Sequence, residues 1–215
     1  KYEAAREEFG EDVDLVLTTR ELARLIKQCN IDFEKLEEAD FDAPLGESTG
    51  AGVIFGTTGG VMEAALRTAY EKATGKILEN VDFEAVRGFE GLRTATISLG
   101  ETQLNVAVVH GLSHARKIME EVKAGNPRNF HAIEVMACPG GCIGGAGQPY
   151  HHGDVSILKK RQAALYTEDQ GKVLRKSHEN PAIKKLYKEF LGEPNSHKAH
   201  KLLHTSYKAK VRFPE

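Results

Sequence analysis

Cys138 and Cys142 stand close together in a segment that is rich in glycine, and the 215-residue sequence contains three cysteines in all. The segment reads CPGGCIGGAGQP, so glycines lie on both sides of the second thiol. Glycine adopts backbone conformations that other residues avoid and lets the main chain approach a bulky ligand closely. Backbone N–H groups presented in this way can satisfy bridging sulfide. The pattern therefore favours thiolates that bind a metal or an iron–sulfur cluster.

Other interpretations of this cysteine pair stay open. A redox disulfide usually has two residues between its cysteines at the start of a helix, whereas three residues separate these two. A structural zinc site would need two more Cys or His ligands in sequence pairs, and none has that pattern here. A disulfide or redox pair and a structural loop remain alternatives. Two thiolates cannot complete a four-ligand cluster, so further ligands are expected from a second copy or from additional sequence.

Histidines beyond this segment are weaker candidates. His197, His200 and His204 fall at i, i+3 and i+7 and can share one helix face, a spacing that metal ligands use. A solvated or packing face explains them better, because the sequence offers no candidate for a supporting hydrogen bond. His151 and His152, which follow the cysteine segment, are expected at the surface.

The strands expected around these residues can be read from apolar runs. Residues 132–136 read as a strand that leads directly to the first thiol. Apolar and polar residues alternate on both sides of Gly100 in residues 93–109, which predicts a β-hairpin. Two shorter apolar runs, 13–17 and 52–55, are also expected to be strands.

Helices are expected between and after these strands. Apolar residues at helical spacing predict three helices with stripes that face the core, and Cys29 is accordingly expected to be a small buried residue. The stripes are Leu22, Leu25, Ile26 and Cys29; Met62, Ala65, Leu66 and Ala69; and Leu112, Ala115, Met119 and Val122. In the tail, Pro181 suits a first helical turn and Ser196 can cap a last helix that extends to about residue 206. The sequence predicts an α/β fold: a mixed sheet with flanking helices and a helical C-terminal tail.

Composition excludes several functional classes. Hydrophobic residues make up 40% of the chain, and the formal net charge is -2, which gives no argument for binding nucleic acid or an anionic membrane surface. No run of about 18 apolar residues is present, and residues 1–8 form a charged, helix-prone stretch unlike a signal peptide. The acidic run 34–40 is expected to be a solvated face. A sparse, odd number of cysteines suits a reducing compartment, so a cytoplasmic location is expected.

A second glycine-rich turn, Gly56-Thr57-Thr58-Gly59-Gly60, lies between an apolar run and a predicted helix. A turn at a helix start can direct free N–H groups at a bound anion. Its spacing matches neither the Walker phosphate loop nor the dinucleotide fingerprint, and a plain tight turn explains it equally well.

A long motif around the cysteines resembles a known family. Residues 134–149, EVMACPGGCIGGAGQP, are similar to the third signature of the iron-only (FeFe) hydrogenases, usually ExMACxxGCxxGGGQP, with Ala146 in place of one glycine. Residues 51–65 look like the stretch that lines the cluster cavity in that family. Residues 196–207 resemble a segment that some members carry as a separate small subunit. The resemblance implies that residues 1–150 are the C-terminal half of the catalytic domain and that 151–215 are a small-subunit-like tail wrapping it.

The resemblance also implies the cofactor and the residues that hold it. The family's active site is a 4Fe–4S cluster joined through one cysteine to a diiron subcluster with CO and CN ligands. By resemblance, Cys138 would bind the 4Fe–4S cluster alone, and Cys142 would bridge it to the diiron subcluster. Met136 and Phe55 would form a dry apolar wall beside the irons. The N–H groups of Gly56, Thr57, Thr58 and Gly59 are expected to face an anionic cyanide ligand.

Two other signatures of the family, TSCCPxW and MPCxxKxxE, are absent from this sequence. They supply the remaining cluster cysteines, a proton-relay cysteine and a lysine that bonds cyanide, and Glu3 resembles the last residue of the second. The chain is therefore expected to be an incomplete fragment that is inactive alone and pairs with an upstream half of the same domain. The implied activity is reversible proton reduction with electrons from ferredoxin or an NAD(P)-linked subunit. An iron–sulfur assembly factor and a hydrogen sensor of the same fold are the alternatives.

Overall fold

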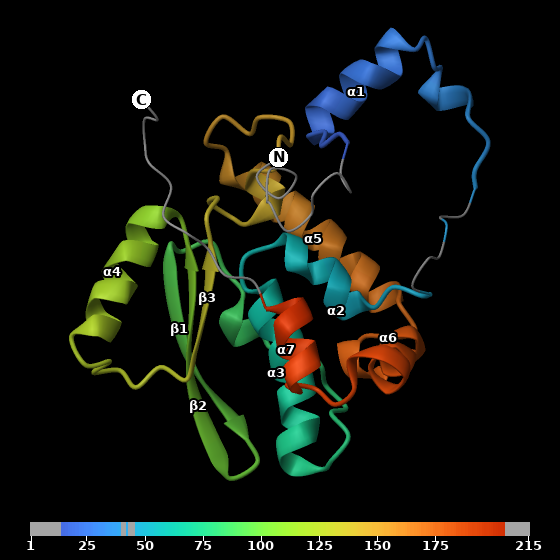
Figure 1. Cartoon of the computed structure of the whole chain (residues 1–215). Helices are drawn as coiled ribbons and strands as arrows, with labels where there is room; N and C mark the ends of the chain where they lie inside the picture. Colours follow the sequence, from blue (N-terminus) through green and yellow to red (C-terminus); the bar gives the residue numbers. More distant parts are fainter. Residues whose placement is uncertain (1–13, 40–41, 43–45, 205–215) are drawn as a thin grey trace, which may run out of the picture.

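The computed structural model describes residues 14–39, 42 and 46–204. In this part of the chain, three strands form one mixed sheet in the order β1-β2-β3 (Figure 1). β1 (Leu92–Leu99) pairs antiparallel with β2 (Thr102–His110), and β2 pairs parallel with β3 (Ala132–Met136). The helix α4 (Leu112–Lys123) makes the crossover between the two parallel strands. The predicted hairpin, the strand before the first thiol and the mixed α/β class are confirmed.

The sheet is covered on both faces. On one face, α3 (Gly60–Thr74) and the short 3₁₀ helix η5 (Glu84–Val86) contribute Met62, Leu66 and Val86 to a core shared with β1 and β2. On the other face, Ala115 and Ile118 of α4 pack against β2. Figure 1 shows α3 and α4 on opposite sides of the strands. This double burial explains why the second half of β2 reads as a continuous apolar run.

Two predictions about the strands are wrong. Residues 52–55 are not a strand but lie in α2 (Gly50–Val53) and the 3₁₀ helix η4 (Ile54–Gly56), because Thr49 caps a helical turn there. A short apolar run cannot by itself distinguish a strand from a buried helix. Residues 14–17 form no strand, and Val13 lies outside the described residues.

In two helices, some residues of the predicted apolar stripe are exposed instead of buried. In α4, Ala115 and Ile118 are buried, whereas Leu112 is 68% exposed and Met119 is also exposed. The helix is thus rotated relative to the predicted face. In α3, Met62 and Leu66 are buried as expected, but the adjacent Ala64 is buried and the predicted Ala65 is exposed.

The helix α1 (Thr19–Gln28) begins after Thr18, which forms a reciprocal capping box with Glu21. Its apolar stripe is not buried: Leu22, Leu25 and Cys29 are all exposed. The prediction that Cys29 is a core residue is therefore wrong, because the described residues place no element over this face. A 3₁₀ turn, η3 (Phe33–Lys35), follows. Figure 1 shows α1 standing apart from the sheet.

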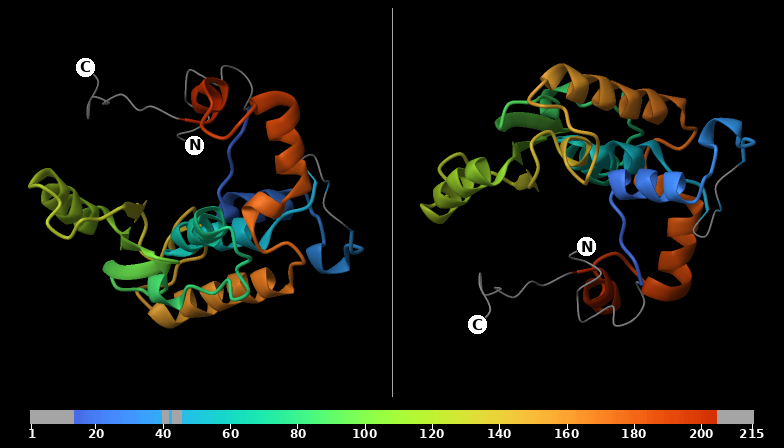
Figure 2. Two further views of the ribbon diagram at one scale, coloured as in Figure 1. Left: turned by 90° about the horizontal axis from the view of Figure 1, so that it is seen from below. Right: turned by 90° about the horizontal axis from the view of Figure 1, so that it is seen from above.

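The tail contains a long helix that the sequence pattern did not predict. α5 (Val155–Gly171) packs against α2 and η4, and η7 (Ser177–Glu179) follows it. After α5 the chain turns toward α6 (Pro181–Leu186), the π-helical turn η8 (Tyr187–Leu191) and α7 (His197–Leu203), as Figure 2 shows. Pro181 occupies the first turn of α6 and Ser196 caps α7, as predicted. No helix among the described residues is both long and apolar enough to cross a bilayer.

Candidate functional site

The candidate site is the loop that follows β3 and carries Cys138 and Cys142. Both cysteines are free, the first partly buried and the second exposed at the start of the 3₁₀ helix η6 (Cys142–Gly144). The loop folds on itself through short backbone bonds, with Gly141 N–H donating to Cys138 O at 3.0 Å and Gly145 N–H donating to Cys142 O at 3.1 Å. The two thiols thus share one compact loop and form no disulfide.

Glycines are sterically required around the thiols. Gly140 and Gly141 have φ of 81° and 88°, a region that side chains rarely adopt. A Cβ on Gly141 would lie 2.7 Å from the amide nitrogen of Thr58, and a Cβ on Gly145 would collide with the Sγ of Cys138. These glycines therefore allow two close contacts. Gly141 lets the loop pack on a neighbouring turn, and Gly145 lets the Cys138 thiol lie directly against the loop backbone.

The neighbouring turn is the second glycine-rich segment. Thr57 and Thr58 are fully buried, and Thr58 N–H donates to Gly140 O at 3.0 Å, so residues 56–58 lie against the cysteine loop. Phe55 precedes this turn and is 47% exposed, while Met136, two residues before Cys138, is partly buried. Phe55 and Met136 thus lie next to the turn and the cysteine loop, but the described residues do not bury either side chain fully.

The N–H groups of the turn are not free for a ligand. Thr57 N–H donates to Ile54 O, and Thr58 N–H is engaged with Gly140 as described above. Gly59 N–H donates to the carboxylate of Glu134 at 2.6 Å. The prediction that these amides face an exogenous anion is therefore wrong for these three amides, because partners within the protein already accept their hydrogen bonds.

The carboxylate of Glu134 accepts hydrogen bonds from amides at the start of α3. It lies on β3, and its second oxygen accepts the N–H of Met62 at 2.7 Å. Burial raises the pKa of the Glu134 carboxyl, and the backbone donors Met62 and Gly59 oppose that rise. The sequence motif includes this residue, but no sequence pattern indicated its partners because they lie more than 70 positions away.

The tail helix α5 also contacts the site. Arg161 donates to Ile143 O at 2.7 Å and to Pro149 O at 2.8 Å, which ties the middle and the C-terminal end of the glycine-rich loop to one side chain. Gln162 donates to the Thr57 hydroxyl at 2.9 Å. The pattern-based reading missed these residues because it did not predict α5. The tail is therefore part of the scaffold that positions the thiols.

The donor set fits part of an iron–sulfur site. Two free thiols lie on a loop whose glycines leave space beside the sulfurs, which suits a bulky sulfide-bridged group. The Thr58 hydroxyl is fully buried and has no hydrogen-bond partner within the described part of the chain. Two thiolates are half of the ligands that a 4Fe–4S cluster needs. The residues present therefore fit one side of such a cluster.

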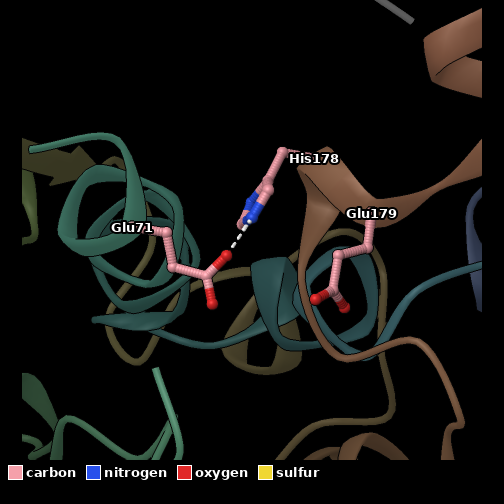
Figure 3. Close-up of side chains that lie close together, drawn as sticks. All are labelled: Glu71, His178 and Glu179. Atoms are coloured by element: carbon pink, nitrogen blue, oxygen red, sulfur yellow. Dashed lines mark hydrogen bonds and ion pairs between the residues drawn. The ribbon is translucent and has the colours of Figure 1, made fainter. Parts of the chain in front are cut away.

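A second group of ligand-type side chains lies elsewhere. Glu71, His178 and Glu179 bring ligand atoms within 4.8 Å of one another, and His178 Nε2 lies 2.7 Å from a Glu71 oxygen (Figure 3). The ammonium of Lys176 already lies 2.6 Å and 2.9 Å from the two carboxylates. A cation thus occupies the position that a metal would take. We interpret this group as an ion-pair cluster that joins α3 to the tail.

The tail histidines do not form a comparable group. His197, His200 and His204 are exposed, and the rings of His200 and His204 stack with centroids 4.7 Å apart. In the described ranges, three or more ligand-type atoms converge only at the Glu71 cluster. This agrees with the interpretation of the three histidines as a solvated face.

Comparison with known proteins identifies the family. Residues 1–146 match the family described as iron only hydrogenase large subunit, C-terminal domain, and residues 155–210 match the iron hydrogenase small subunit. The chain belongs to the iron-only hydrogenase family, and it corresponds to the C-terminal part of the catalytic domain.

Individual relatives agree with this assignment. The chain is 61% identical to the NADP-reducing hydrogenase subunit HndD of Solidesulfovibrio fructosivorans, over 99% of this chain and 37% of that protein. It is 34% identical to Protein NAR1 of Arabidopsis thaliana, over 99% of this chain and 48% of that protein. A solved structure of an FeFe-hydrogenase HydA1 variant from Chlamydomonas reinhardtii superposes with a TM-score of 0.73 and 42% identity, covering 96% of this chain and 60% of that one. The chain thus spans less than half the length of these curated relatives.

Proposed function

We propose that this chain is the cysteine-bearing C-terminal part of an enzyme that reduces protons to dihydrogen reversibly. The observation that carries the proposal is the pair of free thiols, Cys138 and Cys142, on a glycine loop that is docked against the turn after Phe55. The high identity to a protein named as a hydrogenase subunit supports this activity over other functions of the fold.

In this proposal Cys138 would hold the 4Fe–4S cluster alone, and Cys142 would hold both that cluster and the diiron subcluster with CO and CN ligands. When bound, the cofactor would relay electrons from the partner protein and offer an open iron position. The protein supplies orientation: because Gly145 has no side chain, the Cys138 thiol can lie directly against the loop backbone. Gly56, Thr57, Thr58 and Gly59 shape the wall opposite the loop by packing, since three of their amides are engaged.

Phe55 and Met136 form the apolar side of the proposed pocket. Exclusion of water from a reactive metal needs a closed wall, and Phe55 is half-exposed in the described residues. An upstream half of the same catalytic domain is therefore the proposed partner that closes the pocket and supplies the remaining ligands. We place residues 1–150 in the catalytic domain and residues 151–215 in the tail.

The electron partner is proposed to be ferredoxin or an NAD(P)-linked subunit. The name of the relative HndD, an NADP-reducing hydrogenase subunit, supports the nicotinamide-linked choice. The cytoplasmic location stays part of the proposal and depends on the three sparse cysteines.

An iron–sulfur assembly factor is the second candidate function, because the chain is also 29% identical to the cytosolic iron-sulfur assembly component 3 of Mus musculus. Met136 and the GGAGQP run after Cys142 favour the enzyme, since these residues resemble the hydrogenase signature closely. The much higher identity to HndD points the same way.

Hydrogen evolution separates the two candidates. The full-length protein, produced together with a maturation system for the diiron subcluster, is assayed with reduced viologen as the electron donor. Hydrogen production by the parent, and its loss in Cys142→Ala, supports the enzyme. A protein that carries its full iron complement and produces no hydrogen contradicts it and favours the assembly factor.

A further inference from the structure

Glu134 forms an unusual cap for a helix that lies far away in the sequence. The carboxylate is 6% exposed, and its two oxygens accept the N–H groups of Gly59 and Met62 at 2.6 Å and 2.7 Å. The first N–H groups of a helix have no partner within the helix and must find one outside it. The residue at the N-cap position of α3 is Gly59, which has no side chain to accept them. Glu134 replaces the missing cap from β3.

This cap fixes the helix start relative to the strand that leads to the thiols. A carboxylate at a helix N-terminus is stabilised by the helix dipole as well as by the N–H donors. Glu134 stands four residues before Cys138, and the last two residues of β3 lie between them. A displacement of α3 relative to β3 would therefore break two buried hydrogen bonds to a carboxylate.

A second link closes the same unit. Thr58 N–H donates to Gly140 O at 3.0 Å, one residue before the Gly59 amide that Glu134 accepts. The first thiol lies between the two attachment points, because residues 134 and 140 flank position 138. The turn is tightly packed, since a Cβ on Gly60 would collide with the carbonyl oxygen of Ile54. The thiol segment is thus attached on both sides to one helix start.

We infer that Glu134 is a positioning residue that sets the place of Cys138, and with it Cys142, relative to the turn after Phe55. Glu134 acts through the backbone and does not touch the bound group. The inference rests on the proposed function insofar as the group that the thiols hold is the iron–sulfur cofactor. It predicts that the carboxylate controls the geometry of the site and not only the stability of the fold.

The variant Glu134→Gln tests this inference in the full-length protein after cluster loading. Glutamine keeps the size of the side chain but replaces one accepting oxygen with an amide group that cannot accept an N–H. The readout is the infrared spectrum of the CO and CN ligands, compared per loaded cluster. Asn180→Ala is the matched control: Asn180 is 8% exposed and accepts two backbone N–H groups at the start of α6, away from the cysteine loop. Shifted or split bands in Glu134→Gln together with unchanged bands in Asn180→Ala are expected, whereas unchanged bands in both variants overturn the inference.

A measurement without the cofactor separates this inference from the proposed function. The test uses the apo-forms of the parent and of Glu134→Gln. In each, the rate of maleimide labelling of the partly buried Cys138 is divided by that of the exposed Cys29 in the same molecule. Loss of a buried hydrogen bond to Glu134 is expected to raise the relative labelling of Cys138 about fivefold or more. An unchanged ratio overturns the inference even if the parent binds the cofactor. A parent that never binds it contradicts the proposed function alone, and Glu134→Asp serves if the glutamine variant does not fold.

Discussion

Arg67 of α3 and Asp169 of α5 form a bidentate ion pair, with Nη1 and Nη2 each 2.8 Å from a carboxylate oxygen, although 102 positions separate the two residues. Both side chains are fully buried. Arg67 also donates to Glu63 at 2.9 Å and to Val81 O at 2.9 Å, so its polar atoms are satisfied. The pair joins the segment that matches the large-subunit family to the helix that matches the small-subunit family.

Removing one partner of this pair is expected to destabilise the fold strongly. Asp169→Ala leaves a buried guanidinium without its main counter-charge, which costs about 3–5 kcal/mol. Urea unfolding followed by circular dichroism measures the change in the free energy of unfolding. The exposed pair Lys35 and Asp32 is the control, and Lys35→Ala is expected to cost about 0–1 kcal/mol. Equal losses of unfolding free energy in the two variants would show that the buried pair stabilises the fold no more than an exposed pair does.

Ala146 departs from the family motif at a position that favours glycine. Its φ is 51°, in the left-handed region, where a Cβ costs roughly 1–2 kcal/mol. Glycine removes that strain but gains backbone freedom in the unfolded chain, so Ala146→Gly is expected to stabilise the protein by about 0.5–1 kcal/mol. Ala124→Gly, at φ of -76°, is the control and is expected to be destabilising. A lower melting temperature for Ala146→Gly would contradict this account of the loop.

Gly145 is expected to be essential for the thiol geometry. A methyl group there collides with the Sγ of Cys138, so Gly145→Ala must displace the thiol or the loop. Disturbed support of a ligand lowers metal affinity by roughly 10- to 100-fold. Iron per chain, measured after reconstitution and desalting at limiting iron, is the readout. Gly171→Ala is the control because a Cβ there meets nothing within 4 Å. Similar iron contents in both variants would count against the proposed ligand position.

The acid stability of the fold should depend on Glu71. The Lys176 ammonium, the Leu78 amide and His178 lower the pKa of Glu71 to about 2, from 4.5. Because the folded-state pKa is depressed, Glu71 contributes stability that is fully present above pH 4.5 and is lost as the pH falls toward 2. Glu71→Gln is expected to lower stability at neutral pH and to flatten the pH dependence of the melting temperature in this window. Glu101→Gln, on the exposed hairpin turn, should leave the pH dependence of the melting temperature unchanged. An unchanged pH dependence in Glu71→Gln would show that the ion-pair cluster does not contribute to acid stability.

The parts of the fold that the sequence predicted correctly have strong local patterns. Alternation of apolar and polar residues defines β1 and β2, and the strand before Cys138 has the predicted bounds of Ala132–Met136. The capping residue Ser196 marks a helix start because its side chain accepts the amide three positions away.

The errors arise where the outcome depends on distant contacts. The run 52–55 is short and apolar, so the packing of α2 against α5 decides that it is helical. Cys29 is exposed, although a buried position was predicted for it. Periodicity shows which residues share a helix face, but it does not show whether another element covers that face. Glu134 was visible as part of the motif, yet its partners, Gly59 and Met62, come together with it only in the folded chain.

The central claim is that Cys138 and Cys142 hold the iron–sulfur cofactor, and the most direct test is the iron content of single cysteine variants of the full-length protein. Cys138→Ala and Cys142→Ala are compared with Cys29→Ala, which removes an exposed thiol on α1. The first two variants are expected to lose the charge-transfer absorbance and the iron of the cofactor, whereas Cys29→Ala keeps both at the parent level. Full iron content and unchanged absorbance in Cys138→Ala and Cys142→Ala would contradict the central claim.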